Sequence, residues 1–184
     1  MELDWNPMGH EPATVYDQPH FDFHFYTVTA AERNAIDPTV LGASYQTKAD
    51  NLPAENERYG FYVPVSPPGA PVASVPKMGV HWADLRAPEL QAVFGHPENA
   101  RTFTTTFLHG TWDGRFIFDE PMVTRAFIMG RKTATSAASR DSVIALSTAQ
   151  KYPSAAYRPD AYHVTYDAQA KEYRIALTQL TYRQ

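Results

Sequence analysis

The run QPHFDFHFYTV at residues 18–28 alternates phenylalanine with polar residues. Successive side chains of a β-strand point to opposite faces of a sheet, so this run predicts a strand over residues 20–28. One face of the strand is apolar and suits a hydrophobic core. The other face carries potential metal ligands or proton-transfer groups: His20, Asp22 and His24. Polar groups flanked by apolar neighbours need partners or a function, so these three residues are the first site candidates.

Length and residue types favour a single β-rich domain. A chain of 184 residues can bury a sizeable core. Eleven Tyr, ten Phe and three Trp favour strands, and fifteen Pro disfavour a helical bundle. We predict an α+β fold, a mostly antiparallel β-sheet or barrel-like domain with two or three short helices. Within residues 1–184 we expect an extended N-terminal arm over residues 1–18 and a Pro-rich loop over residues 64–77.

Local signals place further elements along the chain. Thr29 and Glu32 match a capping box, which predicts a short helix over about residues 30–36. Asp113 and Gly114 supply the positive φ angles of a hairpin turn. The other expected elements are strands over residues 61–65, 102–108, 115–118, 161–166 and 173–180, and a loop over residues 131–142.

Charge and motif content disfavour several classes of protein. The net charge is −4 and no basic run is present, which disfavours a nucleic-acid partner. No apolar stretch approaches the roughly 20 residues of a membrane-spanning helix, and we expect no secretory signal in the sequence. Without cysteine, a metal site must use histidine, carboxylate or backbone oxygen. Gly-x-Ser-x-Gly, His-Glu-x-x-His, the phosphate loop and the dinucleotide fingerprint are absent.

Histidines and a carboxylate elsewhere in the chain extend the polar strand face into a candidate metal site. Three imidazoles with one carboxylate are a common ligand set for zinc, iron, manganese or copper. The expected cofactor is therefore a divalent transition metal ion. The candidate metal ligands are His10, His20, His24, His81 and Glu120. The candidate catalytic residues are Glu120, as ligand or base, and Asp22.

Strand geometry limits which of these residues share an ion. Positions i and i+4 on a strand lie about 13 Å apart at their Cα atoms. His20 and His24 therefore reach one ion only if both lean inward or the strand is bulged. Positions i and i+2 lie about 6.6 Å apart, so Asp22 pairs more readily with either histidine. Alternatively, Asp22 orients a ligand imidazole by accepting its second N–H.

Each candidate also has a purely structural interpretation. A histidine on a strand is often a hydrogen-bonded core residue. Neighbouring residues could hold His81 in a turn, and Glu120 could pair with Arg115 or Arg125. His109, beside the hairpin turn, is a weaker candidate than the others.

Four segments carry a set of motifs that spans nearly the whole chain. They are residues 4–12 (DWNPMGHEP), 19–26 (PHFDFHFY), 78–84 (MGVHWAD) and 103–127, which contains DG and EPM. Together they resemble a family of bacterial proteins that is classed only as a domain of unknown function and whose members are mostly exported. The resemblance implies a single α+β domain in the periplasm or outside the cell, and it assigns no reaction.

Carried onto this chain, the resemblance implies a set of motif positions. His109 stands where an aromatic residue is expected, so it is left out of the set. The set also looks like the three-His, one-Glu site of cupins. Cupins place two histidines two positions apart, whereas His20 and His24 are four apart, so this likeness is an analogy only. The implied positions are His10, His20, Asp22, His24, His81 and Glu120.

Two functional hypotheses follow from these patterns. The first is a metal-binding extracytoplasmic protein, or a metal-dependent enzyme, in which Asp22 lies outside the direct ligand set. The second is a metal-free ligand-binding or homo-oligomeric assembly module. In that case an aromatic pocket takes a small apolar ligand or a second subunit. The aromatic residues of that pocket would be Phe21, Phe23, Tyr26 and Trp82.

Overall fold

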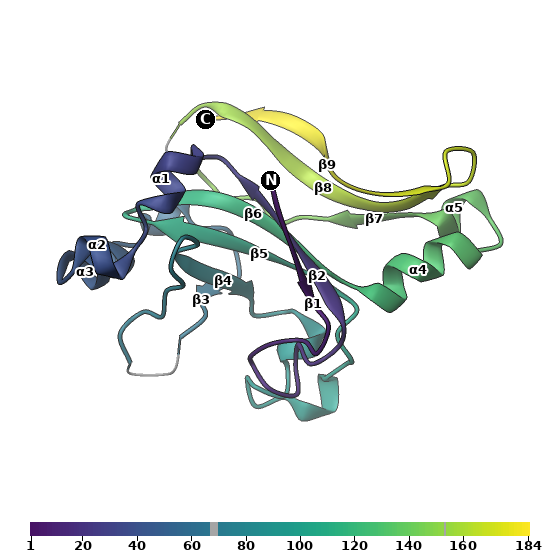
Figure 1. Ribbon diagram of the computed structural model, residues 1–184, viewed down its shortest axis with the longest axis horizontal. Helices are drawn as coiled ribbons and strands as arrows, with labels where there is room; N and C mark the ends of the chain where they lie inside the picture. Colours follow the sequence, from purple (N-terminus) through teal and green to yellow (C-terminus); the bar gives the residue numbers. More distant parts are fainter. Residues whose placement is uncertain (67–69, 153) are drawn as a thin grey trace.

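Two antiparallel β-sheets carry the fold in a computed structural model that describes residues 1–66, 70–152 and 154–184 (Figure 1). The first sheet has the strand order β1-β2-β6-β5-β4-β3, and the second has the order β7-β8-β9. The α+β, mostly antiparallel fold predicted from the sequence is confirmed. The strands are β1 (Glu2–Asn6), β2 (His20–Tyr26), β3 (Tyr62–Pro64), β4 (Val80–Asp84), β5 (Thr105–Trp112), β6 (Arg115–Thr124), β7 (Asp141–Ala145), β8 (Ala156–Asp167) and β9 (Glu172–Arg183).

The helices of the described residues are all short, and the α-helices outnumber the two or three predicted. The α-helices are α1 (Ala30–Asn34), α2 (Pro38–Leu41), α3 (Ser44–Asp50), α4 (Arg125–Thr133) and α5 (Ala137–Arg140). The 3₁₀ helices are η1 (Glu55–Glu57), η2 (Pro88–Leu90) and η3 (Pro97–Asn99). None of the helices in this part of the chain is both long and apolar enough to cross a membrane.

The strand and helix expected over residues 20–36 are present, with slightly earlier ends. β2 ends at Tyr26 and α1 ends at Asn34. The Thr29 hydroxyl accepts a hydrogen bond from the Glu32 backbone N–H at 3.2 Å. The Glu32 carboxylate accepts one in return from the Thr29 backbone N–H at 2.9 Å. The predicted capping box therefore starts the helix directly after the strand.

The sequence also predicts a hairpin turn and a loop from their small and polar residues. The hairpin turn between β5 and β6 is confirmed, with φ angles of 48° at Asp113 and 79° at Gly114. The prediction of a loop over residues 131–142 is wrong, because this segment contains the end of α4, all of α5 and the start of β7. Ser136 caps α5 by accepting from the Ser139 backbone N–H at 3.0 Å. A polar residue read as loop is here a helix cap.

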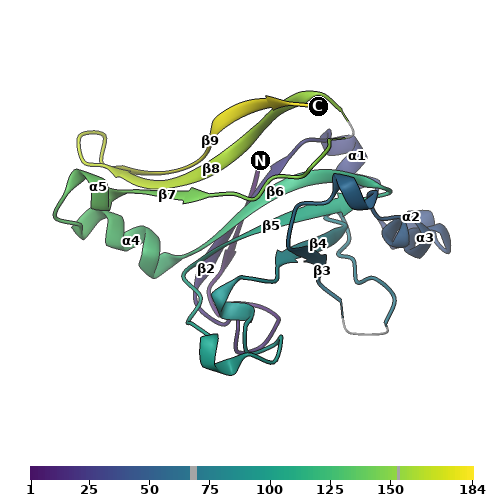
Figure 2. The ribbon, with the colours of Figure 1, turned by 180° about the vertical axis from the view of Figure 1, so that it is seen from behind.

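The phenylalanine face of β2 packs against the second sheet. Figures 1 and 2 show β7, β8 and β9 stacked along one side of the six-stranded sheet. Fully burying a phenylalanine side chain stabilises the fold by about 1.5–3 kcal/mol. The buried cluster between the sheets contains Phe23, Phe107, Val123, Ile128, Tyr162 and Val164.

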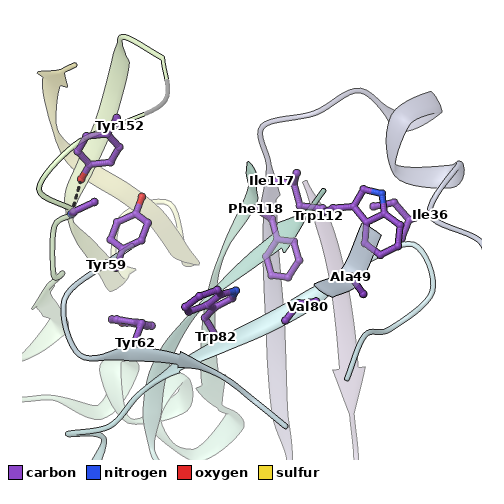
Figure 3. Packing of buried hydrophobic residues seen from close by; sticks show 11 residues of the cluster. Ile36, Ala49, Tyr59, Tyr62, Val80, Trp82, Trp112, Ile117, Phe118 and Tyr152 are labelled. Atoms are coloured by element: carbon purple, nitrogen blue, oxygen red, sulfur yellow. Dashed lines mark hydrogen bonds between the residues drawn. The ribbon is translucent and has the colours of Figure 1, made fainter. Parts of the chain in front are cut away.

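A second core cluster lies toward the β3–β4 end of the same sheet, and Figure 3 shows Tyr62, Trp82 and Tyr152 within it. Phe21 and Phe23 belong to the cluster between the sheets, whereas Tyr26 and Trp82 belong to this one. The four residues expected to line one aromatic pocket are thus divided between two core clusters.

The opposite face of the large sheet is the polar face of β2. Segments before β2 and between β4 and β5 cover part of it (Figure 1). Val15 and Tyr16 from the first segment and Phe103 from the second meet Leu108 and Met122 of the sheet in a third buried cluster. The Pro-rich loop predicted over residues 64–77 starts at the last residue of β3, and its residues 67–69 lie outside the described residues.

Candidate metal centre

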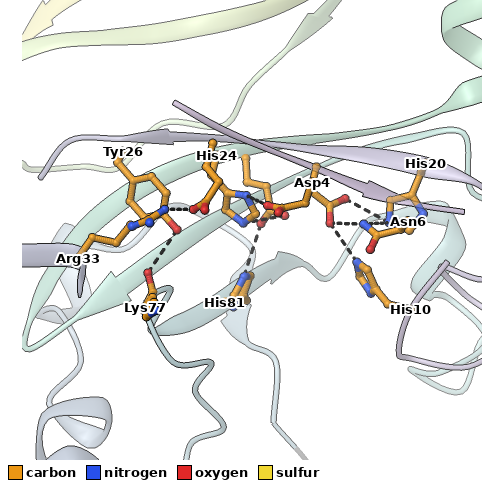
Figure 4. Close-up of polar contacts among 12 residues, drawn as sticks. Asp4, Asn6, His10, His20, His24, Tyr26, Arg33, Lys77 and His81 are labelled. Atoms are coloured by element: carbon orange, nitrogen blue, oxygen red, sulfur yellow. Dashed lines mark hydrogen bonds and ion pairs between the residues drawn. The ribbon is translucent and has the colours of Figure 1, made fainter. Parts of the chain in front are cut away.

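Strand pairing brings polar residues from three strands onto the face that carries His20, Asp22 and His24. β1 pairs antiparallel with β2, with Asp4 opposite Asp22. β6 lies on the other side of β2, and its register brings Glu120 beside His24. The side chains therefore form a row along β2 in Figure 4, with His24 and Asp4 near its centre and His10 and His20 at one end.

The first ligand group consists of His24, His81 and Glu120, and we name it the buried triad. One ligand atom of each residue lies within 4.8 Å of the other two. Nε2 of His24 is 3.3 Å from Oε1 of Glu120, and Nε2 of His81 is 3.7 Å from Oε2. Nδ1 of His24 is 3.2 Å from Oδ2 of Asp4. Two imidazoles and one carboxylate thus converge, with a second carboxylate beside them.

Gly110 allows His81 to reach this group from β4. Gly110 lies opposite His81 in the β4–β5 pair and opposite Phe118 in the β5–β6 pair. A Cβ atom at Gly110 would lie 1.8 Å from Cε1 of Phe118. The Phe118 ring fills this space and contacts both histidines, with ring centroids 5.0 Å from His24 and 5.2 Å from His81. An apolar ring therefore packs directly against the polar group.

Burial shifts the pKa of every member of the buried triad toward the neutral form. It lowers the pKa of His24, and it lowers that of His81 to about 4. It raises the pKa of Glu120 well above the ordinary value, and the negative charges of Asp22 and Asp4 add to that effect. Both imidazoles are therefore neutral at pH 7 and free to bind a metal through a lone pair.

Several polar atoms in and beside the buried triad are buried without a hydrogen-bond partner in the described part of the chain. They include both ring nitrogens of His24, Oε2 of Glu120 and Oδ2 of Asp4. A neutral imidazole carries only one N–H, so His24 cannot donate to both carboxylates at once. Buried polar atoms of this kind are rare in folded proteins, and an ion coordinated between them is one way to satisfy them.

The second ligand group consists of His10, His20 and Asp22, and we name it the arm triad. Its ligand atoms also lie within 4.8 Å of one another. Nε2 of His20 is 3.1 Å from Oδ1 of Asp22, and Nε2 of His10 is 3.4 Å from Oδ2. The Asn6 side-chain amide donates to Oδ2 of Asp22 at 2.7 Å. This group therefore combines β2 with the segment that precedes it.

The charges in the arm triad are complementary. Hydrogen bonding to Asp22 raises the pKa of His10. Burial alone would raise the pKa of Asp22, but hydrogen bonds from His10 and His20 outweigh it and hold that pKa well below the usual range. Asp22 is therefore an anion at neutral pH, available as a ligand.

The structure brings all six predicted site residues to one sheet face, but in two groups rather than one. His20 and His24 fall in different groups, as expected from their separation of about 13 Å along a strand. Asp22 is a direct member of the arm triad. Asp4 and Asn6 were missed, although Glu2, Asp4 and Asn6 alternate with Leu3 and Trp5 in the same period-two pattern that marked β2.

His109 belongs to neither group and lies on the opposite face of the sheet. Its Nδ1 is 2.8 Å from Oδ1 of Asp119, and its ring stacks on Tyr59 with centroids 3.6 Å apart. Both residues of the His109–Asp119 pair are buried. This arrangement fits a core ion or hydrogen-bond pair.

Comparisons with known proteins add no assignment. No protein-family model, no curated protein and no solved structure matches this chain. The resemblance to a bacterial family therefore stays a prediction.

Proposed function

We propose that this protein binds a divalent transition-metal ion at the buried triad. The observation that carries the proposal is the convergence of two neutral imidazoles and one buried carboxylate, with both ring nitrogens of His24 and Oε2 of Glu120 left without a hydrogen-bond partner among the described residues. Two histidines and one carboxylate are a ligand set of both zinc and non-haem iron sites. Zinc, iron, manganese and copper all suit these donors.

The number of protein ligands favours a reactive centre. Three protein ligands leave coordination positions open, which is typical of catalytic rather than structural metal sites. The His81 side chain is 18% exposed and that of Asp4 is 39% exposed, whereas His24 and Glu120 are buried. The open side thus faces Asp4 and His81. When bound there, the ion would activate water or dioxygen.

The roles of the individual residues follow from their positions. His24 and His81 supply ring nitrogens, and Glu120 supplies a carboxylate that must lose its proton before it binds. Asp4, 3.2 Å from Nδ1 of His24, orients that ring or enters the coordination sphere. The substrate would be a small molecule that reaches the open side. We also propose a location outside the cytoplasm, supported by the resemblance to exported bacterial proteins.

Metal analysis tests this proposal. Protein purified without chelator and without a nickel column is dialysed, and its metal content is measured by mass spectrometry. We expect the wild type to hold an ion that His81→Ala and Glu120→Gln each lose. His96→Ala is the matched control, because His96 is an exposed histidine outside both groups. Full metal content in both triad variants would contradict the proposal.

A further inference from the structure

The arm triad has a hydrogen-bonding pattern that determines where its protons lie. Nδ1 of His20 is 2.7 Å from the carbonyl oxygen of Gln18, and Nδ1 of His10 is 2.6 Å from that of Glu11. A carbonyl oxygen only accepts hydrogen bonds, so each Nδ1 carries a proton. In the neutral form of each ring, Nε2 then carries a lone pair and no proton.

Both of these lone pairs point at one carboxylate. Nε2 of His20 faces Oδ1 of Asp22, and Nε2 of His10 faces Oδ2. Among the described residues, Oδ1 of Asp22 has no hydrogen-bond partner. Acceptors that face one another repel unless a positive charge lies between them. The Asn6 side-chain nitrogen lies 3.5 Å from Nε2 of His20 and partly satisfies it. A cation between the three side chains would satisfy all of the facing acceptors, including Oδ1 of Asp22.

The second hydrogen bonds of the three side chains match those of metal ligands. A histidine that binds a metal usually donates its other ring N–H to a backbone carbonyl or carboxylate, and both His10 and His20 do so. Ligating carboxylates are usually hydrogen-bonded in turn, as Asp22 is by Asn6.

We infer that the arm triad is a second metal site, which takes a divalent transition-metal ion through Nε2 of His10, Nε2 of His20 and the Asp22 carboxylate. This inference extends the proposed function from one ion to two. The sites are neighbours, because Asp22 and His24 lie two positions apart on β2, about 6.6 Å at their Cα atoms. The pair of sites therefore forms one two-ion face on the sheet.

The second ion would also link two parts of the chain. His10 lies outside the sheet, in the segment between β1 and β2, and its backbone N–H donates to the Tyr16 carbonyl at 3.0 Å. His20 and Asp22 lie on β2. Metal binding would therefore hold the His10–Tyr16 segment against the sheet. His10 is 38% exposed, so the ion would enter from that side.

A titration of the metal-free full-length chain with Co²⁺ tests the second site. We expect wild type to take up two ions, and His10→Ala and His81→Ala to take up one each. His10→Ala removes a half-exposed ring outside the sheet, so the fold should persist, and His163→Ala serves as the control. In hydrogen exchange, Co²⁺ should slow the amides of residues 10–16 in wild type and in His81→Ala, but not in His10→Ala.

The outcomes separate this inference from the proposed function. One ion in wild type, lost in His81→Ala and kept in His10→Ala, would overturn the second site and leave the first. One ion lost only in His10→Ala would support the arm triad and contradict the buried triad. No uptake of Co²⁺ would contradict both sites.

Discussion

The imidazole of His24 lies between two carboxylates, with Nε2 3.3 Å from Oε1 of Glu120 and Nδ1 3.2 Å from Oδ2 of Asp4. Glu120 is buried on β6, and Asp4 is half-exposed on β1. In the metal-free protein His24 has only one N–H to donate, so its second ring nitrogen depends on the proton that burial keeps on Glu120. The same arrangement preorganises the side chains for a cation.

Glu120→Gln should separate apo-protein stability from metal binding. Burial in the folded protein raises the pKa of Glu120 well above its ordinary value of 4.5, so the folded state holds this proton more tightly than the unfolded state. The contribution of Glu120 to stability therefore falls as pH rises from that value toward the raised pKa. In chelator, Glu120→Gln should gain stability over wild type at pH 8 and lose this advantage at pH 4. Urea denaturation at both pH values measures this difference in stability between the variant and the wild type.

The same variant should bind metal at least about 10–100-fold more weakly, the range for loss of groups that only orient ligands. Competition with a coloured chelator measures this affinity. Equal pH dependence of stability in Glu120→Gln and wild type would show that Glu120 does not titrate as burial requires.

Phe23→Ala and Asp22→Asn should separate the two faces of β2. Phe23 is 7% exposed in the core between the sheets, so its truncation should cost about 3–5 kcal/mol. Asp22→Asn keeps the side-chain shape, should cost the apo protein less than Phe23→Ala does, and should weaken Co²⁺ binding by at least about 10–100-fold. Denaturation of each apo variant, followed by metal titration, provides both numbers. If Asp22→Asn destabilises as much as Phe23→Ala and leaves affinity unchanged, Asp22 is a structural anchor.

Gly110→Ala should destabilise the protein and disturb the buried triad together. The new Cβ atom would overlap the Phe118 ring, which packs on both His24 and His81. Overpacking of this kind costs about 1–3 kcal/mol or more. Gly130→Ala is the control, since nothing lies within 4 Å of a Cβ atom at that position. Because Gly130 lies in helix α4, the alanine should raise the free energy of unfolding by about 0.5–1 kcal/mol. Thermal melts and metal titration of both variants check this.

His109→Ala should change stability without changing metal content. It leaves the buried Asp119 carboxylate without its 2.8 Å partner, at a cost of about 1–3 kcal/mol. Its ring lies on the opposite sheet face from both triads, so Co²⁺ uptake should match wild type. A loss of one ion in this variant would place His109 in the metal centre. It would contradict the assignment of His109 and the two triads to opposite faces of the sheet.

Much of the local structure around the site could be predicted because local rules specify it. The alternation in residues 20–26 identified β2 and divided its side chains between core and site. Thr29 with Glu32, and Asp113 with Gly114, identified a helix start and a hairpin turn from contacts within a few residues. The same local rules failed over residues 131–142, where Ser136 caps a helix that polar composition alone reads as loop.

The sequence by itself determined which residue types carry the chemistry and which face of β2 they occupy, since a strand's two-residue period is a local property. Only the tertiary structure decided which histidine meets which carboxylate. His24 meets Glu120 because β6 pairs with β2, and Asp4 joins them because β1 pairs with the other edge of β2. Strand order and register are set by packing over the whole sheet, between residues far apart in the chain. No local pattern around His20 or His24 specifies those partners, so the sequence left open which residues share an ion.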